Sequence, residues 1–233
     1  MSTFSIIFWI HPRNMTDSEI IVLIQKIISE IRDNLYNGNL PVFEPAYSKS
    51  KCKEIEVTPE YFLKEFNKRG NRKDREMGIS YTLKFFSPLD LDYEKAIVYN
   101  FSLGGSSCRV PNSVVVSLPY EIISEKNNFE KIFNIFKSFV SASKPYFSFL
   151  LNNENGFGKG GYWKEKPTFV HTLNYFDEET AQKIGIEKLR KLQSAEEADG
   201  GWYLKLLDEP LDVDNPLHLE TQKQISEFLG LID

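Results

Sequence analysis

Cysteine and histidine are scarce in this chain of 233 residues, which has two cysteines and three histidines. Two thiols, Cys52 and Cys108, are too few for a disulfide framework, and this favours a reducing cytoplasmic setting. His11, His171 and His218 lie far apart in the sequence, and none has the spacing of a metal ligand. We therefore expect no metal and no other cofactor.

Long apolar runs are missing as well. No stretch approaches the roughly 18 residues of a membrane helix, which argues against a membrane partner. The N-terminal stretch has no basic residue ahead of its apolar run. We therefore expect residues 4–10 to form a first strand and not a signal peptide.

The chain also lacks an excess of positive charge. Its formal net charge of −5 at pH 7 argues against a general nucleic-acid binder. The charge is nevertheless uneven along the sequence. Residues 194–233 contain ten acidic and two basic side chains, a net charge of −8, whereas residues 49–75 have a net charge of +4. Such an asymmetry bears on the choice of partner and not on the fold.

Aromatic residues, by contrast, are plentiful, at 14% of the chain, and can fill a large core. The first long helix is predicted to begin at a capping box, in which the Thr16 hydroxyl and the Glu19 carboxylate bind free backbone amides. Isoleucines then recur at helical spacing as far as the sequence Asn37-Gly38-Asn39, which is predicted to end the helix.

The remaining elements follow from hydrophobic periodicity and turn residues. Strands are predicted at residues 79–86, 96–103, 113–118, 168–176 and 202–207, and residues 40–53 are expected to be irregular. Helices are predicted to start near Thr58, Asn127 or Asn128, Asp177, and Asn215. The last helix is expected to turn inward its apolar residues Leu217, Ile225, Phe228, Leu229 and Ile232.

This order of elements predicts an α+β fold, with a mixed, mostly antiparallel β-sheet of about six strands packed with about five helices. No repeat, low-complexity tract or clear linker divides the chain. We therefore expect residues 1–233 to form a single domain.

Two sequences suggest catalytic or phosphate chemistry, but the context of each argues against it. Cys108 would need a base to become a nucleophile, and nothing in the sequence places His171 beside it. Residues 156–161 read Gly-Phe-Gly-Lys-Gly-Gly, which is similar to a phosphate-binding loop. A strand is predicted to follow, however, and a phosphate site needs the N-terminus of a helix. A surface loop is the expectation there.

The densest group of carboxylates lies between the last predicted strand and the last helix. Asp208, Glu209, Asp212 and Asp214 occur among two prolines, without the glycine that a calcium loop requires. Asp214 or Asn215 is expected to cap the last helix. The other carboxylates are expected to be exposed on a stiff connection, where they form a candidate binding patch for a basic partner.

The chain resembles the immunity protein 52 family of bacterial polymorphic-toxin systems. The likeness lies in the run GGWYLKLLDEPLDVDNPLH at residues 200–218, in PNSVVVSLP at residues 111–119, and in an N-terminal strand with Trp9 that precedes a long helix.

The resemblance implies a non-enzymatic cytoplasmic protein that binds and blocks a toxin domain delivered by contact-dependent or type VI secretion. Toxins linked to this family are often nucleases of the restriction-endonuclease fold. Because nucleases bind phosphates through basic grooves, an acidic patch on the inhibitor could occupy such a groove.

Two other functions stay open at this point. The chain could be a small cytosolic enzyme that uses Cys108 or the carboxylate group, although the sequence offers no matched nucleophile and base. It could also be a nucleic-acid-associated module that uses the basic residues 49–75, although no nucleic-acid-binding motif is present. Our expectation is an immunity protein without a nucleic-acid partner.

Overall fold

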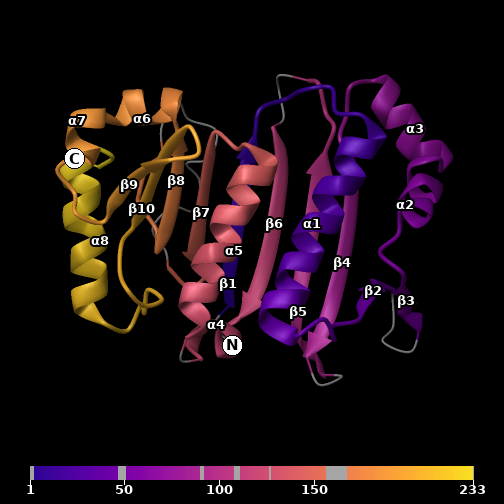
Figure 1. The fold of residues 1–233 in the computed structure, drawn as a ribbon, viewed down its shortest axis with the longest axis horizontal. Helices are drawn as coiled ribbons and strands as arrows, with labels where there is room; N and C mark the ends of the chain where they lie inside the picture. Colours follow the sequence, from indigo (N-terminus) through magenta and orange to yellow (C-terminus); the bar gives the residue numbers. More distant parts are fainter. Residues whose placement is uncertain are drawn as a thin grey trace.

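A single antiparallel sheet runs through the molecule from end to end (Figure 1). The computed structural model describes residues 3–46, 51–89, 92–107, 111–125, 127–155 and 167–232. Within these residues ten strands follow the order β3-β2-β4-β5-β6-β1-β7-β8-β10-β9. All pairings between them are antiparallel.

The described residues form these elements, in chain order. The strands are β1 (Thr3–Ile10), β2 (Val42–Glu44), β3 (Lys53–Ile55), β4 (Tyr81–Leu89), β5 (Asp92–Leu103), β6 (Asn112–Pro119), β7 (Phe147–Asn152), β8 (Leu173–Asp177), β9 (Ala195–Ala198) and β10 (Gly201–Lys205). The helices are α1 (Asp17–Tyr36), α2 (Pro59–Phe66), α3 (Arg69–Glu76), α4 (Tyr120–Ser124), α5 (Asn128–Ser143), α6 (Glu178–Ile184), α7 (Ile186–Leu189) and α8 (Pro216–Leu229).

The α+β class and the antiparallel sheet are confirmed, but the predicted numbers of strands and helices are too low. The predicted mixed sheet is wrong too, because the described pairings are antiparallel throughout. The missed strands β2, β3 and β9 span only three or four residues each, too few to show a period. The missed strand β7 is buried at every position, so it lacks the alternation of a half-exposed strand.

The central strand β1 is buried on both sides and separates two cores. Phe4, Ile6 and Phe8 belong to a large cluster that includes the isoleucines of α1 and the phenylalanines of α5. Ile7 and Trp9 point to the opposite face and pack against a second cluster, formed by β7, β8, β10, α6, α7 and α8. Figure 1 looks onto the face that α1 and α5 cover.

Helix α1 begins as the sequence predicts. The Glu19 amide donates to Thr16 Oγ1 at 3.2 Å, and the Thr16 amide donates to a Glu19 carboxylate oxygen at 2.6 Å. Asn37 then ends the helix in the left-handed conformation. The buried face of α1 carries six isoleucines and Leu23, so local capping and core burial agree on the same start.

The hairpin of β9 and β10 turns through two residues, Asp199 and Gly200. Both have positive φ, at 54° and 74°, which is the geometry of a type I′ turn and favours the pair Asp-Gly. Gly201 follows where a Cβ atom would lie 2.3 Å from the Phe176 carbonyl oxygen. The Gly200-Gly201 pair is therefore required by the turn and by the close approach of β8.

Replacing Thr16 by alanine should lower the free energy of unfolding by about 1 kcal/mol, because the Glu19 amide loses its acceptor at the start of α1. Urea unfolding followed by circular dichroism measures the change. Ser18→Ala, at an exposed position in the same turn, is the matched control and should change stability by less than about 0.5 kcal/mol. Equal effects of the two substitutions would contradict the capping argument.

Candidate functional site: the acidic connection before α8

The four predicted carboxylates lie on residues 206–215, which connect β10 to α8. Asp208, Glu209, Asp212 and Asp214 are all exposed, and the side chains of Asp208 and Glu209 keep 98% and 68% of their surface accessible. We call these four residues the acidic connection. The structure places them at the surface, as expected, and their role in binding stays a prediction.

A buried leucine anchors the middle of the acidic connection. The Leu211 side chain is 1% exposed, and both of its backbone polar groups are bound by side chains. Its amide donates to Thr172 Oγ1 at 3.3 Å, and its carbonyl accepts from Asn152 Nδ2 at 2.9 Å. The backbone between Asp208 and Asp214 is thus fixed to the interior through Thr172 and Asn152.

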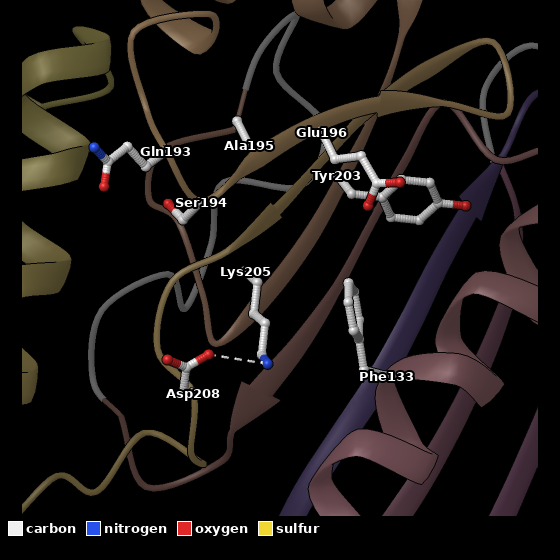
Figure 2. Close-up of a pocket in the computed structure, with 8 residues that line it drawn as sticks. All are labelled: Phe133, Gln193, Ser194, Ala195, Glu196, Tyr203, Lys205 and Asp208. Carbon is white, nitrogen blue, oxygen red and sulfur yellow. Dashed lines mark ion pairs between the residues drawn. The ribbon is translucent and has the colours of Figure 1, made fainter.

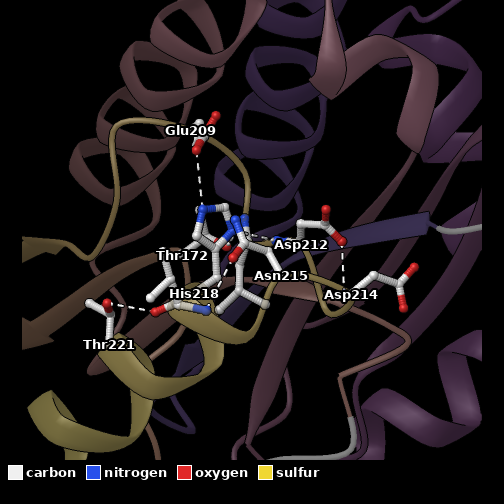
Figure 3. A network of polar contacts seen from close by, with 9 residues as sticks. Thr172, Glu209, Asp212, Asp214, Asn215, His218 and Thr221 are labelled. Atoms are coloured by element: carbon white, nitrogen blue, oxygen red, sulfur yellow. Dashed lines mark hydrogen bonds and ion pairs between the residues drawn. The ribbon is translucent and has the colours of Figure 1, made fainter.

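His218 of α8 supports the acidic connection from the other side (Figure 3). The Asp212 amide donates to His218 Nδ1 at 3.1 Å, and His218 Nε2 lies 3.1 Å from a Glu209 carboxylate oxygen. Because Nδ1 accepts a hydrogen bond, the proton of the neutral ring is on Nε2, which donates to Glu209. A single imidazole therefore fixes both ends of the segment 209–212. The His218 side chain is only 10% exposed, and no local sequence signal indicated this supporting role.

The last helix is capped by Asn215, one of the two residues that the sequence allowed. Asn215 Oδ1 accepts from the Leu217 amide at 3.1 Å. Asp214 does not cap the helix. Instead, its own amide donates to the Asp212 carboxylate at 2.9 Å. The segment is closed by two short side-chain turns, which hold the carboxylates in place before any partner arrives.

The inward face of α8 carries both polar and apolar side chains, so the predicted apolar face is only partly right. Leu229 is buried in the second core and Ile225 packs against it, as predicted. His218, Gln222 and Ser226, spaced by four residues, are buried, whereas Leu217 and Phe228 are 73% and 43% exposed. The reason lies beneath the helix. The sequence predicted a strand at residues 168–176, but β8 starts only at Leu173. Residues 168–172 are therefore not part of a strand. Their buried backbone groups need side-chain partners.

The polar residues of α8 supply those partners. Gln222 Nε2 donates to the Val170 carbonyl at 2.7 Å, and the Val170 amide donates to Ser226 Oγ at 3.2 Å. Asn155 Nδ2 donates to the Gln222 side-chain oxygen at 2.9 Å. These hydrogen bonds fix the position of α8, the helix that carries His218. Because His218 supports the acidic connection, the geometry of that connection depends on them.

Asp208 has an internal counter-charge. Lys205 Nζ lies 3.0 Å from an Asp208 carboxylate oxygen and also pairs with Glu130 of α5. Burial disfavours the Lys205 ammonium, but the two carboxylates outweigh it and raise the pKa of Lys205 above its ordinary value. The acidic connection is thus tied to α5 through one lysine.

Sequence reasoning missed a surface cavity beside this lysine. The cavity, of about 390 Å³, lies between α5 and the β9–β10 hairpin (Figure 2). It is lined by Phe133, Gln193, Ser194, Ala195, Glu196, Tyr203, Lys205 and Asp208. Seven of the eight lie within residues 193–208, and Phe133 comes from α5. The cavity therefore depends on the packing of α5 beside the hairpin, which no local sequence pattern indicates.

Cys108 and the glycine-rich residues 156–161 lie outside the described residues. In the part of the chain that the structure describes, no three residues among His, Cys, Asp and Glu gather as a metal site. None of the helices in these segments has the length and apolar character needed to cross a bilayer.

The basic residues 49–75 fall largely on α2 and α3. Arg69, Arg72 and Lys73 are exposed on α3. Arg75, however, has a structural role, because it donates to the Met15 carbonyl at 2.7 Å and lies over the Tyr81 ring. This surface lies at the β3 end of the sheet, far from the acidic connection (Figure 1).

Comparison with known proteins adds a fold likeness and a partial family match. Residues 164–232, less than a third of the chain, match a family described as a domain of unknown function, DUF5953. No curated protein matches the chain. The structure is similar to that of the Pseudomonas aeruginosa T6SS protein PA0821, with a TM-score of 0.62 and 9% identity, over 98% of this chain and 72% of that one. The resemblance to the immunity protein 52 family stays a prediction.

Replacing Gln222 by leucine should lower the free energy of unfolding by roughly 1–3 kcal/mol, because the buried Val170 carbonyl loses its donor. Gln224→Leu is the matched control on the same helix, since Gln224 is exposed and bonds to Glu220 at the surface. Chemical denaturation of both variants measures the difference. If the control lost as much stability as the buried variant, the seating of α8 by hydrogen bonds would be refuted.

His171 should make the protein sensitive to acid. Burial against Phe149 lowers the pKa of His171 from 6.5 to about 3. Between these pH values the unfolded chain takes up a proton that the folded chain excludes. The free energy of unfolding therefore falls as pH falls, by about 1.4 kcal/mol per pH unit from this residue.

His171→Phe keeps a ring at this position and should flatten the decline in stability between pH 6.5 and pH 4, as measured by urea unfolding at each pH. His11→Gln is the control, because His11 is 62% exposed, and should leave the slope as it is. Parallel pH profiles for the wild type and His171→Phe would contradict the assignment.

Proposed function

We propose that the protein is a cytoplasmic immunity protein that neutralises a cognate secreted bacterial toxin, of nuclease type, by direct binding. The observation that carries the proposal is the acidic connection, in which exposed carboxylates are held by a buried network. A preorganised surface loses little conformational entropy on binding, and its charge steers an oppositely charged partner.

The chemistry of the partner follows from the sign of the surface. A nuclease neutralises phosphates with lysine and arginine in its groove, and Asp208, Glu209, Asp212 and Asp214 offer complementary charge. The resemblance to the immunity protein 52 family supports a toxin of the restriction-endonuclease fold. The fold likeness to a T6SS protein supports a role in type VI secretion, in competition between bacteria.

The arrangement of the carboxylates favours binding over catalysis. A hydrolytic site would bring a nucleophile and a base within hydrogen-bond distance of each other and of a substrate. Here Asp208 pairs with Lys205, Glu209 with His218 and Asp212 with a backbone amide. These contacts stabilise the loop, and the outward carboxylate oxygens are left for a partner.

Reversing three charges, with Asp208→Lys, Glu209→Lys and Asp212→Lys together, should weaken binding to the cognate toxin domain by at least about 100-fold, because three attractive contacts become repulsive. The partner to use is a toxin domain encoded by a neighbouring gene. Calorimetry at several salt concentrations gives the affinity, and co-expression gives protection from growth arrest.

The control reverses two other exposed carboxylates of the same acidic region, Glu220→Lys and Glu227→Lys on α8. It should leave protection intact. An unchanged affinity and salt dependence in the triple variant would overturn the role of the acidic connection. A lack of any binding by the wild type would overturn the immunity function.

A further inference from the structure

Two lysines of the protein itself lie against the aromatic residues of the cavity between α5 and the β9–β10 hairpin. Lys205 lines the cavity, and Lys137 contacts the lining residues from beside it. Lys137 Nζ lies 4.7 Å from the centre of the Phe133 ring and 5.2 Å from that of Tyr203. Lys205 Nζ lies 5.6 Å from the centre of Phe133. These distances fall within the range at which an aromatic face attracts a cation. The walls of the cavity therefore stabilise positive charge.

Each of these lysines pairs with a carboxylate that is more exposed to solvent than the lysine itself. Glu196 pairs with Lys137 at 2.7 Å, and Asp208 pairs with Lys205 at 3.0 Å. The lysine side chains are only 30% and 18% exposed, whereas those of Glu196 and Asp208 are 58% and 98% exposed. Each carboxylate has about four acceptor sites and uses few of them here. An approaching partner therefore meets negative charge with unused hydrogen-bonding capacity.

The fold explains why the cavity is open. Tyr203 and Glu196 are direct partners in the pairing of β10 with β9, so their side chains share one face of the hairpin. That face continues beyond α5, and no other labelled helix lies in front of it in Figure 1. The flank of α5, through Phe133, forms the other wall, as Figure 2 shows. The volume is within the range of about 300–1,000 Å³ that is usual for ligand pockets.

We propose that this cavity binds the guanidinium group of an arginine side chain of the basic protein partner. Of the two lysines, Lys137 is the more easily displaced, because it has one carboxylate partner where Lys205 has two. The incoming arginine takes the place of the Lys137 ammonium, stacks on Phe133 and Tyr203, and pairs with Glu196.

Arginine suits this site better than lysine does. Its planar group stacks on aromatic rings, binds a carboxylate through two parallel hydrogen bonds and is less strongly hydrated than an ammonium. Arginine is also prominent among the residues that dominate protein interfaces. Asp208 belongs both to the cavity and to the acidic connection. The inference therefore rests on the proposed function, and it adds that an arginine of the toxin binds in this cavity.

The test uses the full chain, labelled with nitrogen-15, and tetra-arginine amide as the probe at low salt. Chemical shift changes should concentrate on residues 193–196, 203–205 and 133–137, and tetra-lysine amide should bind about threefold or more weakly. Shift changes confined to residues 208–214, or equal affinities for the two peptides, would overturn the proposal.

Two pairs of variants separate the cavity from general charge. Glu196→Gln should weaken tetra-arginine binding about three- to tenfold, whereas Glu197→Gln, on the opposite face of the same strand, should change it less than twofold. Lys137→Met should tighten binding by freeing Glu196 and Phe133. Lys131→Met makes the same change of charge at an exposed position of α5 and is its control. Equal effects within either pair would overturn the site.

The result for the peptide is separable from that for the toxin. If the cavity variants leave tetra-arginine binding unchanged while co-expression still protects cells, the cavity assignment is wrong and the immunity function stands. If tetra-arginine binds as described but the wild-type protein does not bind the toxin domain, the proposed function is wrong.

Discussion

The requirement that buried backbone groups be hydrogen-bonded shapes the end of this molecule that carries the acidic connection. Residues 168–172 pass beneath α8 without entering a strand, so no neighbouring strand satisfies the backbone of the buried Val170. Gln222 and Ser226 do so instead. Once these two residues set the position and rotation of α8, His218 faces the connection, where it binds the Asp212 amide and Glu209. The geometry of an exposed acidic surface is thus determined by a buried peptide that side chains, and not a neighbouring strand, satisfy.

The elements that the sequence predicts well are those whose signals are local. The capping box at Thr16 and the isoleucine spacing locate α1, and hydrophobic periodicity after Asn127 and Asn128 locates α5, because caps and periodicity are both local features of the sequence. The strand β9 escaped prediction, although the pair Asp199-Gly200 is a strong hairpin signal. Its sequence, Ala-Glu-Glu-Ala, has no apolar alternation. The strand β7 escaped for the opposite reason, since it is apolar or buried at every position.

The candidate site also has features that local sequence predicts and features that depend on distant contacts. The exposure of its carboxylates and the cap at Asn215 follow from a stretch of nine residues and could be foreseen. The polar face of α8 could not, because the partner of Gln222 is Val170, 52 residues earlier in the chain. Three polar residues therefore share the buried face of α8 with Leu229, and Leu217 is left at the surface. The cavity depends on a contact of still longer range, between Phe133 of α5 and Tyr203 of the hairpin, which are 70 residues apart.

The position of β9 at the end of the sheet limits how a partner can attach. A bare edge strand presents free amides and carbonyls, to which another chain can add a strand of its own. Here the edge carries Glu196 on one face and Glu197 on the other. Any added strand would have to desolvate carboxylates on both of its sides. The charged side chains on both faces of β9 therefore disfavour the addition of a strand from another chain at this edge.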